Sequence, residues 1–352
     1  MGRRNQLLPG SPERAPGPRK GRFGAAHADP GDAYADVPIL QQPLWRNEVA
    51  AYIYLGGISS GAFILGALAD LSGERWRSLA QTAHVTSFAA MAPCVPLLVH
   101  DLGRPSRFHH MLRIFKPSSP MNLGAWTLFV HSGFSTLLTA RALAERGKLP
   151  LVGPLARRLP SRLLAAGGLL PAVTLGGYTG VLLGTTSVPV WSKSPVLGGL
   201  FMSSAIASGT AAVSLASILS GRDAPAEHAA LASIGMVAGA AELGLMGGYL
   251  ASSGKAAAPL RQGADGALLL GAATTTTTAL ALDIVGMRGN AWQRVGKALA
   301  ASAALAGGAM LRWAVVRAGR ASAGDRDANL EAMRPSAQNR GWGPPNAAAR
   351  LT

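Results

Sequence analysis

Cysteine is almost absent from this sequence of 352 residues, which contains Cys94 alone. A single thiol excludes a disulfide framework within the chain, because such a framework needs pairs of cysteines. It also excludes a four-cysteine zinc site and an iron–sulfur cluster held by this chain alone, since both need several thiolates. Any iron–sulfur chemistry connected with this protein must therefore belong to another subunit.

Charged residues are also scarce: they make up 14% of the chain, against roughly 25% in an ordinary globular protein. Hydrophobic residues account for 49%, and the mean hydropathy is +0.24 although both ends of the chain are polar. The middle of the chain is therefore too apolar for a water-soluble domain. This composition predicts an integral membrane protein rather than the two or three soluble domains that the length alone would suggest.

Eight apolar segments follow the polar N-terminal end, each close to the roughly 20 residues that a helix needs to cross the hydrocarbon layer. They lie at residues 49–71, 79–99, 123–144, 163–187, 196–219, 229–251, 266–286 and 295–316. The sequence thus predicts an all-α integral membrane protein with eight transmembrane helices. Residues 1–46 are rich in Pro, Gly and Arg, and residues 317–352 are polar, so we expect a disordered tail at each end.

A weak internal repeat divides the predicted helices into two halves. Residues 58–62 (ISSGA) in the first segment resemble residues 206–210 (IASGT) in the fifth, and the offset is half of the helix count. We therefore predict two four-helix bundles, at residues 47–220 and 221–316. The many Gly and Ala residues let membrane helices approach closely. Residues 274–278 are all threonine, whose hydroxyl groups can bond to carbonyl groups of their own helix.

The net charge of +16 does not indicate nucleic-acid binding. Lys and Arg concentrate in the two ends and between apolar segments, which is how membrane proteins set their orientation. The basic segments contain no zinc-finger spacing, RNP-type aromatic motif or recognition helix. Lys and Arg are more numerous on the side of the two termini, so the sequence predicts a multi-pass protein of the inner (cytoplasmic) membrane with cytoplasmic termini and lipid as its surroundings.

The richest polar cluster lies where the second apolar segment meets its loop. Residues 100–108 read HDLGRPSRF, and FKPSSPMN (115–122) and GAW (124–126) follow. This stretch resembles the D-L-G-R-P-x-R-F…F-K-P-x-S-P-M…G-A-W signature of the polysulfide reductase membrane subunits, the NrfD/PsrC family. YLGG (54–57) with SGA (60–62), YTGVLL (178–183) and VPVW (188–191) resemble other motifs of that family, in the same order. The resemblance covers about residues 45–219.

This resemblance implies a quinone-interacting membrane anchor, either a non-catalytic subunit or the quinone-site subunit of an oxidoreductase complex. It implies electron exchange between menaquinone or ubiquinone and a ferredoxin-like partner with [4Fe–4S] clusters, beside a molybdopterin catalytic subunit. Tyr178 lies at the matching tyrosine of the fourth helix, where its hydroxyl group would bond a quinone carbonyl group. Glu48 and Tyr52 are the candidates near the start of the first helix, although Tyr52 stands roughly where some relatives have histidine.

Quinone chemistry also needs groups that pass protons, because each two-electron reduction takes up two of them. Asp101, with His100 as a relay, and Glu48 are candidates. Glu242 is a further proton-transfer candidate, and it is buried by its position in the sixth helix, as Asp283 is in the seventh. Either of these two carboxyl groups could instead be structural, since a buried carboxyl group can pair or stay protonated.

We expect the iron–sulfur partner to dock on the loop after the second helix, at the basic residues Arg104, Arg107 and Lys116. The first helix begins on the face to which this loop returns. Tyr178 lies about 22 Å along the fourth helix at 1.5 Å per residue, past the midplane toward that same face. We therefore expect Tyr178 to face the first helix and to share a small cavity with Tyr52 or Glu48.

Two other function classes stay open. A b-type cytochrome anchor needs two histidines that face each other, but His84 and His100 lie at opposite ends of one helix, about 24 Å apart. We interpret His84 and His131 as packing residues and expect no haem or metal on this chain. A secondary transporter would show helix breaks in both halves. Pro93 and Pro96 interrupt the second helix and Pro171 the fourth, without counterparts in the second half.

Overall fold

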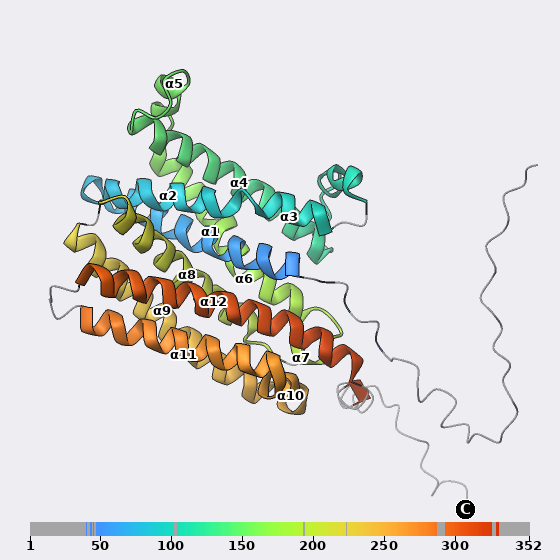
Figure 1. Cartoon of the computed structure of the whole chain (residues 1–352). Coiled ribbons are helices and arrows are strands. Elements are labelled where there is room, and N and C mark those ends of the chain that lie inside the picture. The colour runs from blue at the N-terminus through green and yellow to red at the C-terminus, as the bar shows by residue number, and fades with distance from the viewer. Residues whose placement is uncertain are drawn as a thin grey trace, which may run out of the picture. The chain divides into compact units, whose positions relative to one another are not determined.

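The computed structural model describes residues 40, 43, 45, 47–101, 104–192, 194–222, 224–286, 293–325 and 329–330. Every secondary-structure element that these residues form is a helix (Figure 1). The predicted N-terminal tail and most of the C-terminal tail fall outside the described residues, so the disorder expected there stays a prediction.

The elements follow the predicted apolar segments closely. The long helices are α1 (Asn47–Ser72), α2 (Arg77–Met91) with α3 (Cys94–Asp101), α4 (Pro120–Glu145), α6 (Ser161–Gly184), α8 (Leu197–Leu219), α9 (Pro225–Ser252), α11 (Gly263–Gly286) and α12 (Gln293–Gly324). The short helices between them are η1 (Glu74–Trp76), η2 (Pro105–Leu112), α5 (Gly153–Arg157), α7 (Pro189–Ser192), η3 (Gly254–Ala257) and α10 (Ala258–Arg261).

Seven helical segments among the described residues are long and apolar enough to cross a membrane. They are α1, the segment Glu74–Asp101 that joins η1, α2 and α3, and then α6, α8, α9, α11 and α12. The eighth predicted span is α4, which has 26 residues but is more polar, because His131, Ser135 and Thr139 lie along it. The chain is therefore a multi-pass membrane protein with seven candidate spans, and the crossing by α4 stays a prediction.

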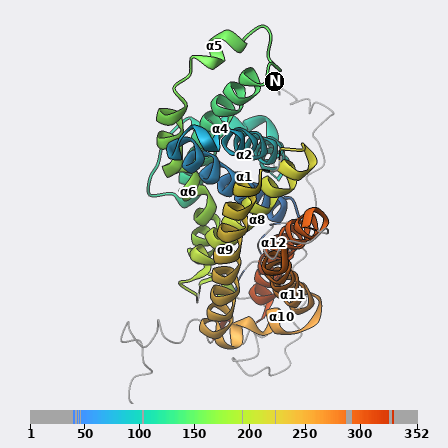
Figure 2. The same ribbon diagram turned by 90° about the vertical axis from the view of Figure 1, so that its left-hand side faces the viewer.

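The long helices pack as two rings of four. α1 contacts α2, α2 contacts α4, α4 contacts α6, and α6 returns to α1. The second ring runs from α8 through α9, α11 and α12 back to α8, and both groups can be followed in Figure 2. We call these rings the first and the second bundle. The predicted division at residue 220 falls one helix later than these contacts indicate, because α8 precedes that residue and completes the second ring.

The two bundles meet where α1 crosses α8, at the two copies of the internal repeat. A side chain at Gly61 would overlap the backbone of Ala205, and one at Gly209 would overlap the backbone of Gly61 and Ala62. Ser60, beside this crossing, donates a hydrogen bond to the carbonyl group of Ala172 in α6 at 2.7 Å. The small residues of the repeat therefore form the packing face between the two bundles.

Proline has different effects in the two helices where we expected a break. α2 ends at Met91 and α3 starts at Cys94, so the helix is interrupted at Pro93, as predicted, whereas Pro96 lies inside α3 and does not interrupt it. α6, however, continues through Pro171. Membrane helices accept proline where neighbours satisfy the freed backbone groups. The expected break at Pro171 is therefore wrong.

α12 continues to Gly324, past residue 316 where we expected a polar tail to begin. The fully buried indole ring of Trp191 in α7 lies directly against Gly319, and its Nε1 donates to the carbonyl oxygen of Val315 at 2.8 Å. Ser322 and Ala323 are also buried. These contacts order the last turns of α12, and composition alone did not reveal them.

The direction of the helices defines two faces of the protein, which we call the N-terminal face and the distal face. The N-terminal face carries the start of α1, the end of α3, η2, α7 and α10, and these elements lie toward one end of the helices in Figure 1. The distal face carries η1, α5 and the segments that follow α8 and α11.

Candidate functional site

Glu48 and His100 lie next to each other at the N-terminal face. Glu48 is in the first turn of α1, and His100 is in the last turn of α3. Glu48 Oε1 is 4.0 Å from His100 Nδ1, and the imidazole ring is the more exposed of the two groups. The structure therefore brings together two residues that are far apart in the sequence and that we predicted as proton carriers.

Tyr52, one turn further along α1, lies beside the same group. It is near enough to interact electrostatically with Tyr178, Asp101 and Cys94. Cys94 is buried, and its Sγ lies 3.7 Å from the carbonyl oxygen of Tyr52, which fixes the start of α3 against α1. Two phenol groups, one from each of two helices, thus interact with each other, and Tyr52 also interacts with Asp101, the neighbour of His100 in the chain.

Tyr178 in α6 is half-buried, and its ring lies directly over Gly124 near the start of α4. Its hydroxyl group donates to the carbonyl oxygen of Pro120. We expected Tyr178 to face α1. Its hydroxyl group bonds instead to the first turn of α4, although Tyr178 still interacts electrostatically with Tyr52 of α1. Gly124 is required because any side chain there would collide with the tyrosine ring.

We call these five residues, Glu48, Tyr52, His100, Asp101 and Tyr178, the N-terminal cluster. They come from α1, α3 and α6. The described residues form a cavity in the second bundle and a smaller one at the distal polar residues of α1, α2 and α4. Tyr52 and Tyr178 line neither of these two cavities. The small shared cavity expected at this place therefore stays a prediction.

The loop between α3 and α4 presents the predicted docking residues to solvent. Arg104, Arg107 and Lys116 are all exposed. Asn122 holds this loop against α4: its Oδ1 accepts from the backbone N–H of Lys116 at 2.7 Å, and its Nδ2 donates to the carbonyl oxygen of Met111 at 2.9 Å. Residues 102 and 103 of the motif lie outside the described residues.

Glu242 does not belong to the N-terminal cluster, because it lies inside the second bundle. Its carboxyl group hydrogen-bonds with Ser204 of α8, and Ser204 accepts a hydrogen bond from Arg312 Nη1 of α12. Arg312 is 1% exposed, and its Nη2 donates to the carbonyl oxygen of Phe201 at 3.0 Å. A buried guanidinium group at membrane depth is costly and is a functional candidate for that reason.

Reasoning from the sequence missed Arg312 because it stands near the end of an apolar segment. In that position a long basic side chain normally extends to the membrane surface. One sequence signal is Gly57 on α1, where a Cβ would lie 3.4 Å from Arg312 Nη2, so a side chain longer than alanine would meet the guanidinium group. This relationship cannot be read before the packing of α1 against α12 is known.

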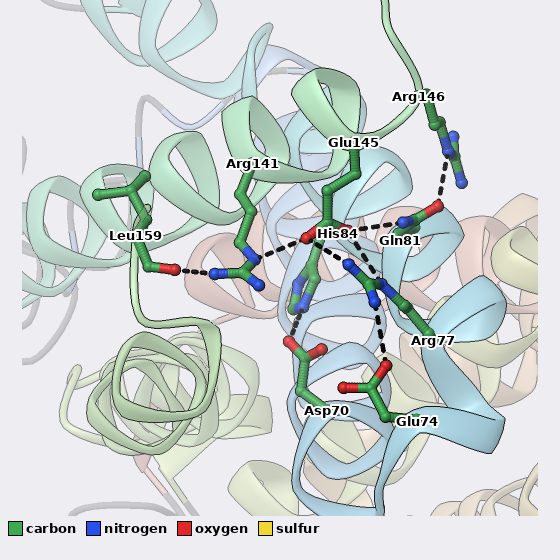
Figure 3. A network of polar contacts seen from close by, with 9 residues as sticks. All are labelled: Asp70, Glu74, Arg77, Gln81, His84, Arg141, Glu145, Arg146 and Leu159. Atoms are coloured by element: carbon green, nitrogen blue, oxygen red, sulfur yellow. Dashed lines mark hydrogen bonds and ion pairs between the residues drawn. The ribbon is translucent and has the colours of Figure 1, made fainter. Parts of the chain in front are cut away.

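A second polar group ties α1, α2 and α4 together at the distal face (Figure 3). Glu145 at the end of α4 is its centre: it bonds to Arg141 at 2.9 Å, to Arg77 at 3.1 Å and to Gln81 at 2.7 Å. His84 Nε2 lies 2.9 Å from Asp70 Oδ2. We call this group the distal polar network, and its geometry is that of a structural clamp between helix ends.

His131 lies in the middle of the first bundle and is fully buried. Its Nε2 is 2.9 Å from Ser59 Oγ, which is 3.1 Å from Ser87 Oγ. The ring of Phe63 packs edge-on against His131 at 5.1 Å and against His84 at 5.7 Å. Both histidines thus have a polar partner and an aromatic neighbour, which is the packing role expected for them.

Comparison with known proteins shows the family to which this sequence is similar. Residues 38–323 match the model of the family described as "Polysulphide reductase, NrfD". Over 178 residues the protein is 28% identical to the C chain of the polysulfide reductase of Wolinella succinogenes, and the match covers 47% of this sequence and 56% of that protein. It is 27% identical to protein NrfD of Escherichia coli over 202 residues, covering 52% and 62%.

A further match is the C subunit of the selenate reductase of Mesobacillus selenatarsenatis, which is 24% identical over 199 residues covering 47% of this sequence and 46% of that protein. The chain thus spans about half the length of the curated relatives it matches. The family model covers most of the chain, including both bundles.

Proposed function

This chain belongs to the NrfD family of polysulphide reductase membrane subunits, and we propose that it binds a quinone and exchanges electrons with an iron–sulfur partner. Two relatives are named as the C components of a polysulfide reductase and of a selenate reductase, which supports a place in a multisubunit reductase. The lone Cys94 supports a division of labour in which the partner holds the iron–sulfur clusters. The family resemblance adds a molybdopterin subunit beyond that partner.

The observation that carries this proposal is the interaction of Tyr52 of α1 with Tyr178 of α6 and with Asp101, which follows His100 of the Glu48–His100 pair. A quinone needs apolar walls and one or two hydrogen-bond donors for its carbonyl groups. The N-terminal cluster supplies two phenol donors from α1 and α6, so its residues fit menaquinone or ubiquinone. The bound quinone would supply two-electron redox chemistry that the amino-acid side chains of the cluster do not perform.

The residues of the cluster have distinct roles in this proposal. The hydroxyl groups of Tyr52 and Tyr178 orient the quinone by hydrogen bonds to its carbonyl groups. Glu48 takes or gives a proton, and the exposed ring of His100, 4.0 Å away, passes it to the aqueous phase. Asp101 is the second carboxyl group of the cluster. Tyr178 must exchange its bond with Pro120 for one to the quinone, which leaves that carbonyl group to water.

The exposed positive charge of Arg104, Arg107 and Lys116 supports docking of the iron–sulfur partner on the same face. The loop lies next to α3, whose last residues are His100 and Asp101. A partner seated there places its terminal cluster close to the quinone, so that electrons need not cross the membrane. Asn122 keeps the loop in this position by its bonds to Lys116 and Met111.

The orientation in the membrane follows from the distribution of basic residues. We infer an inner-membrane protein with eight crossings, α4 included, and with both termini and the partner on the cytoplasmic side. Reporter fusions after residue 46 and after residue 330 should both indicate cytoplasm. Two periplasmic signals would reverse the orientation, and opposite signals would contradict the eighth crossing.

Quinone binding can be tested directly on the purified protein. A short-chain naphthoquinone titrated into the protein in detergent should bind at one site per molecule, as measured by calorimetry. Replacing both Tyr52 and Tyr178 with phenylalanine should weaken this binding without loss of helical content. A binding isotherm unchanged in that double variant would contradict the proposed site.

A further inference from the structure

The second bundle encloses a cavity of about 480 Å³ between α8, α9, α11 and α12. Most of its wall is made of small residues, among them Ala211, Gly235 and Ala300. These residues leave the space open because they carry no side chain long enough to fill it. The four helices around it form the lower group in Figure 2.

The cavity runs from the distal face to Glu242 near the middle of the bundle. At its outer end, Pro225 at the start of α9 is exposed, and Asp283 and Lys297 are partly exposed. Thr210, which like Asp283 lies within 4 Å of a Cβ at Gly235, is 3% exposed, and further in Thr276 is 3% exposed and Glu242 is 2% exposed. Glu242 is the lining residue furthest along α9 from Pro225, and it forms the floor of the cavity.

Three buried oxygen atoms in the inner part of the cavity have no hydrogen-bond partner among the described residues. They are Glu242 Oε1, Thr210 Oγ1 and Thr276 Oγ1. In the threonine run of α11, Thr275, Thr277 and Thr278 bond to carbonyl groups of their own helix, whereas Thr276, which lines the cavity, does not. Buried polar atoms need partners, and a polar cavity of this size holds several water molecules that supply them.

The floor of the cavity is a charged group that lies between it and the first bundle. Ser204 links the Glu242 carboxyl group to the guanidinium group of Arg312, which stacks over the Phe201 ring at 4.7 Å. Tyr54 of α1 interacts electrostatically with both charges and donates to the carbonyl oxygen of Leu305 at 2.7 Å. The cavity therefore ends at Glu242, with this packed group behind it.

We propose that this cavity is a water-filled half-channel that carries protons between the distal face and Glu242. A proton leaves a hydronium ion of the cavity water and forms an O–H bond at Glu242 Oε1; on release the bond breaks and the proton returns to water. Arg312 compensates the carboxylate charge that remains, while Asp283, Lys297 and His228 are the titratable groups nearer the mouth. The proposal extends the proton-transfer role of Glu242 and rests on no property of the quinone.

Cysteine accessibility tests whether the cavity contains water. Single cysteines at Ala211 and Ala300, which line the cavity, are compared with cysteines at Ala238 and Ala314, in a Cys94→Ala background of the full-length protein. All four alanines are buried, at 6%, 2%, 6% and 0% exposure, and only the first pair lines the cavity. Each protein is treated in right-side-out and inside-out vesicles with a charged, membrane-impermeant thiosulfonate, which reacts with thiolates in water.

The cavity cysteines should react at least about tenfold faster than the controls, because only a hydrated thiol ionises readily. They should react from the distal side only. Equal rates at all four positions would mean a dry or lipid-filled cavity and would overturn the proposal, as would labelling from the N-terminal face.

The substitution Gly235→Leu is designed to block the cavity. A Cβ at Gly235 would lie 3.6 Å from Thr210 and 3.9 Å from Asp283, so the backbone tolerates a side chain that fills the cavity.

In the Gly235→Leu background the reaction of the cysteine at Ala211 should become as slow as that of the controls.

Infrared difference spectra of the wild type against Glu242→Gln give the signal of the Glu242 carboxyl group alone. That group should change protonation with the pH of the distal solution, or exchange its proton for deuterium, and Gly235→Leu should slow the response. A carboxyl group that does neither would overturn the proposal, and both readouts are independent of quinone binding.

Discussion

Gly61 of α1 and Gly209 of α8 lie against each other where the first helix of one bundle crosses the first helix of the other. They occupy the same place in the internal repeat. Each allows the opposite backbone to approach to direct contact, which only glycine permits. Gly61→Ala should therefore destabilise the protein by about 1–3 kcal/mol, the usual cost of overpacking, measured as a lower thermal unfolding midpoint in detergent.

Gly56→Ala, on the same helix, is the matched control for this substitution. A Cβ at Gly56 meets nothing within 4 Å, and alanine favours a helix over glycine by about 1 kcal/mol. The control should be neutral or stabilising. Equal stability of the two variants would contradict the close crossing of α1 and α8.

Tyr178→Phe should impair the reaction with quinone while leaving assembly intact. The substitution removes only the hydroxyl group, so one hydrogen bond worth about 0.5–1.5 kcal/mol is lost. Quinone-linked turnover of the complex should fall, or its apparent affinity for quinone should weaken several-fold. The control is Tyr249→Phe in the second bundle, which removes a bond of the same kind, to the carbonyl oxygen of Val190 at 3.0 Å. Quinone kinetics that respond equally to both variants would remove Tyr178 from the site.

Neutralising the docking loop should weaken association with the partner in a salt-dependent way. Arg104→Gln, Arg107→Gln and Lys116→Gln each remove an exposed positive charge, and each should cost about 0.2–1 kcal/mol of binding. The loss should shrink as ionic strength rises, because salt screens exposed charges. Binding of the purified partner at low and high salt gives the measurement. Arg157→Gln and Arg158→Gln on the distal face are the controls, and an equal effect of these would place the partner elsewhere.

Glu145→Gln should loosen the distal polar network. The Glu145 side chain is 11% exposed and pairs with Arg77 and Arg141, and hydrogen bonds to charged groups are worth about 1.5–3 kcal/mol. Glu74→Gln is the control, since Glu74 also pairs with Arg77 but its side chain is 77% exposed. Thermal unfolding should show a clear loss for Glu145→Gln and little change for Glu74→Gln. A reversed order would contradict the clamp role.

The helices could be predicted from the sequence because a membrane span needs a long apolar run, which composition reveals directly. The division into two bundles was predicted from one repeated motif, and the contact between Gly61 and Gly209 explains why that motif occurs in both halves. Pro171 shows the limit of this reasoning, since whether a proline breaks a membrane helix depends on neighbours that the sequence does not identify.

The candidate site was less predictable than the fold. Tyr178 and Tyr52 were found only through resemblance to a family, and the bond from Tyr178 to Pro120 depends on how α6 packs on α4. Arg312 was missed, and the cavity beside Glu242 was not foreseen. The environment of Arg312 and the cavity both depend on which helices are neighbours in the second bundle. The sequence of a single helix does not show which helices are its neighbours.

We propose that a quinone binds among α1, α3 and α6 at the N-terminal face. A photoreactive azidoquinone, illuminated in the membrane-bound complex and followed by mass spectrometry of the cross-linked peptides, tests this most directly. The label should appear on peptides that contain Tyr52 and Tyr178, and excess unlabelled quinone should suppress it. Suppressible labelling confined to α9, α11 or α12 would contradict the account.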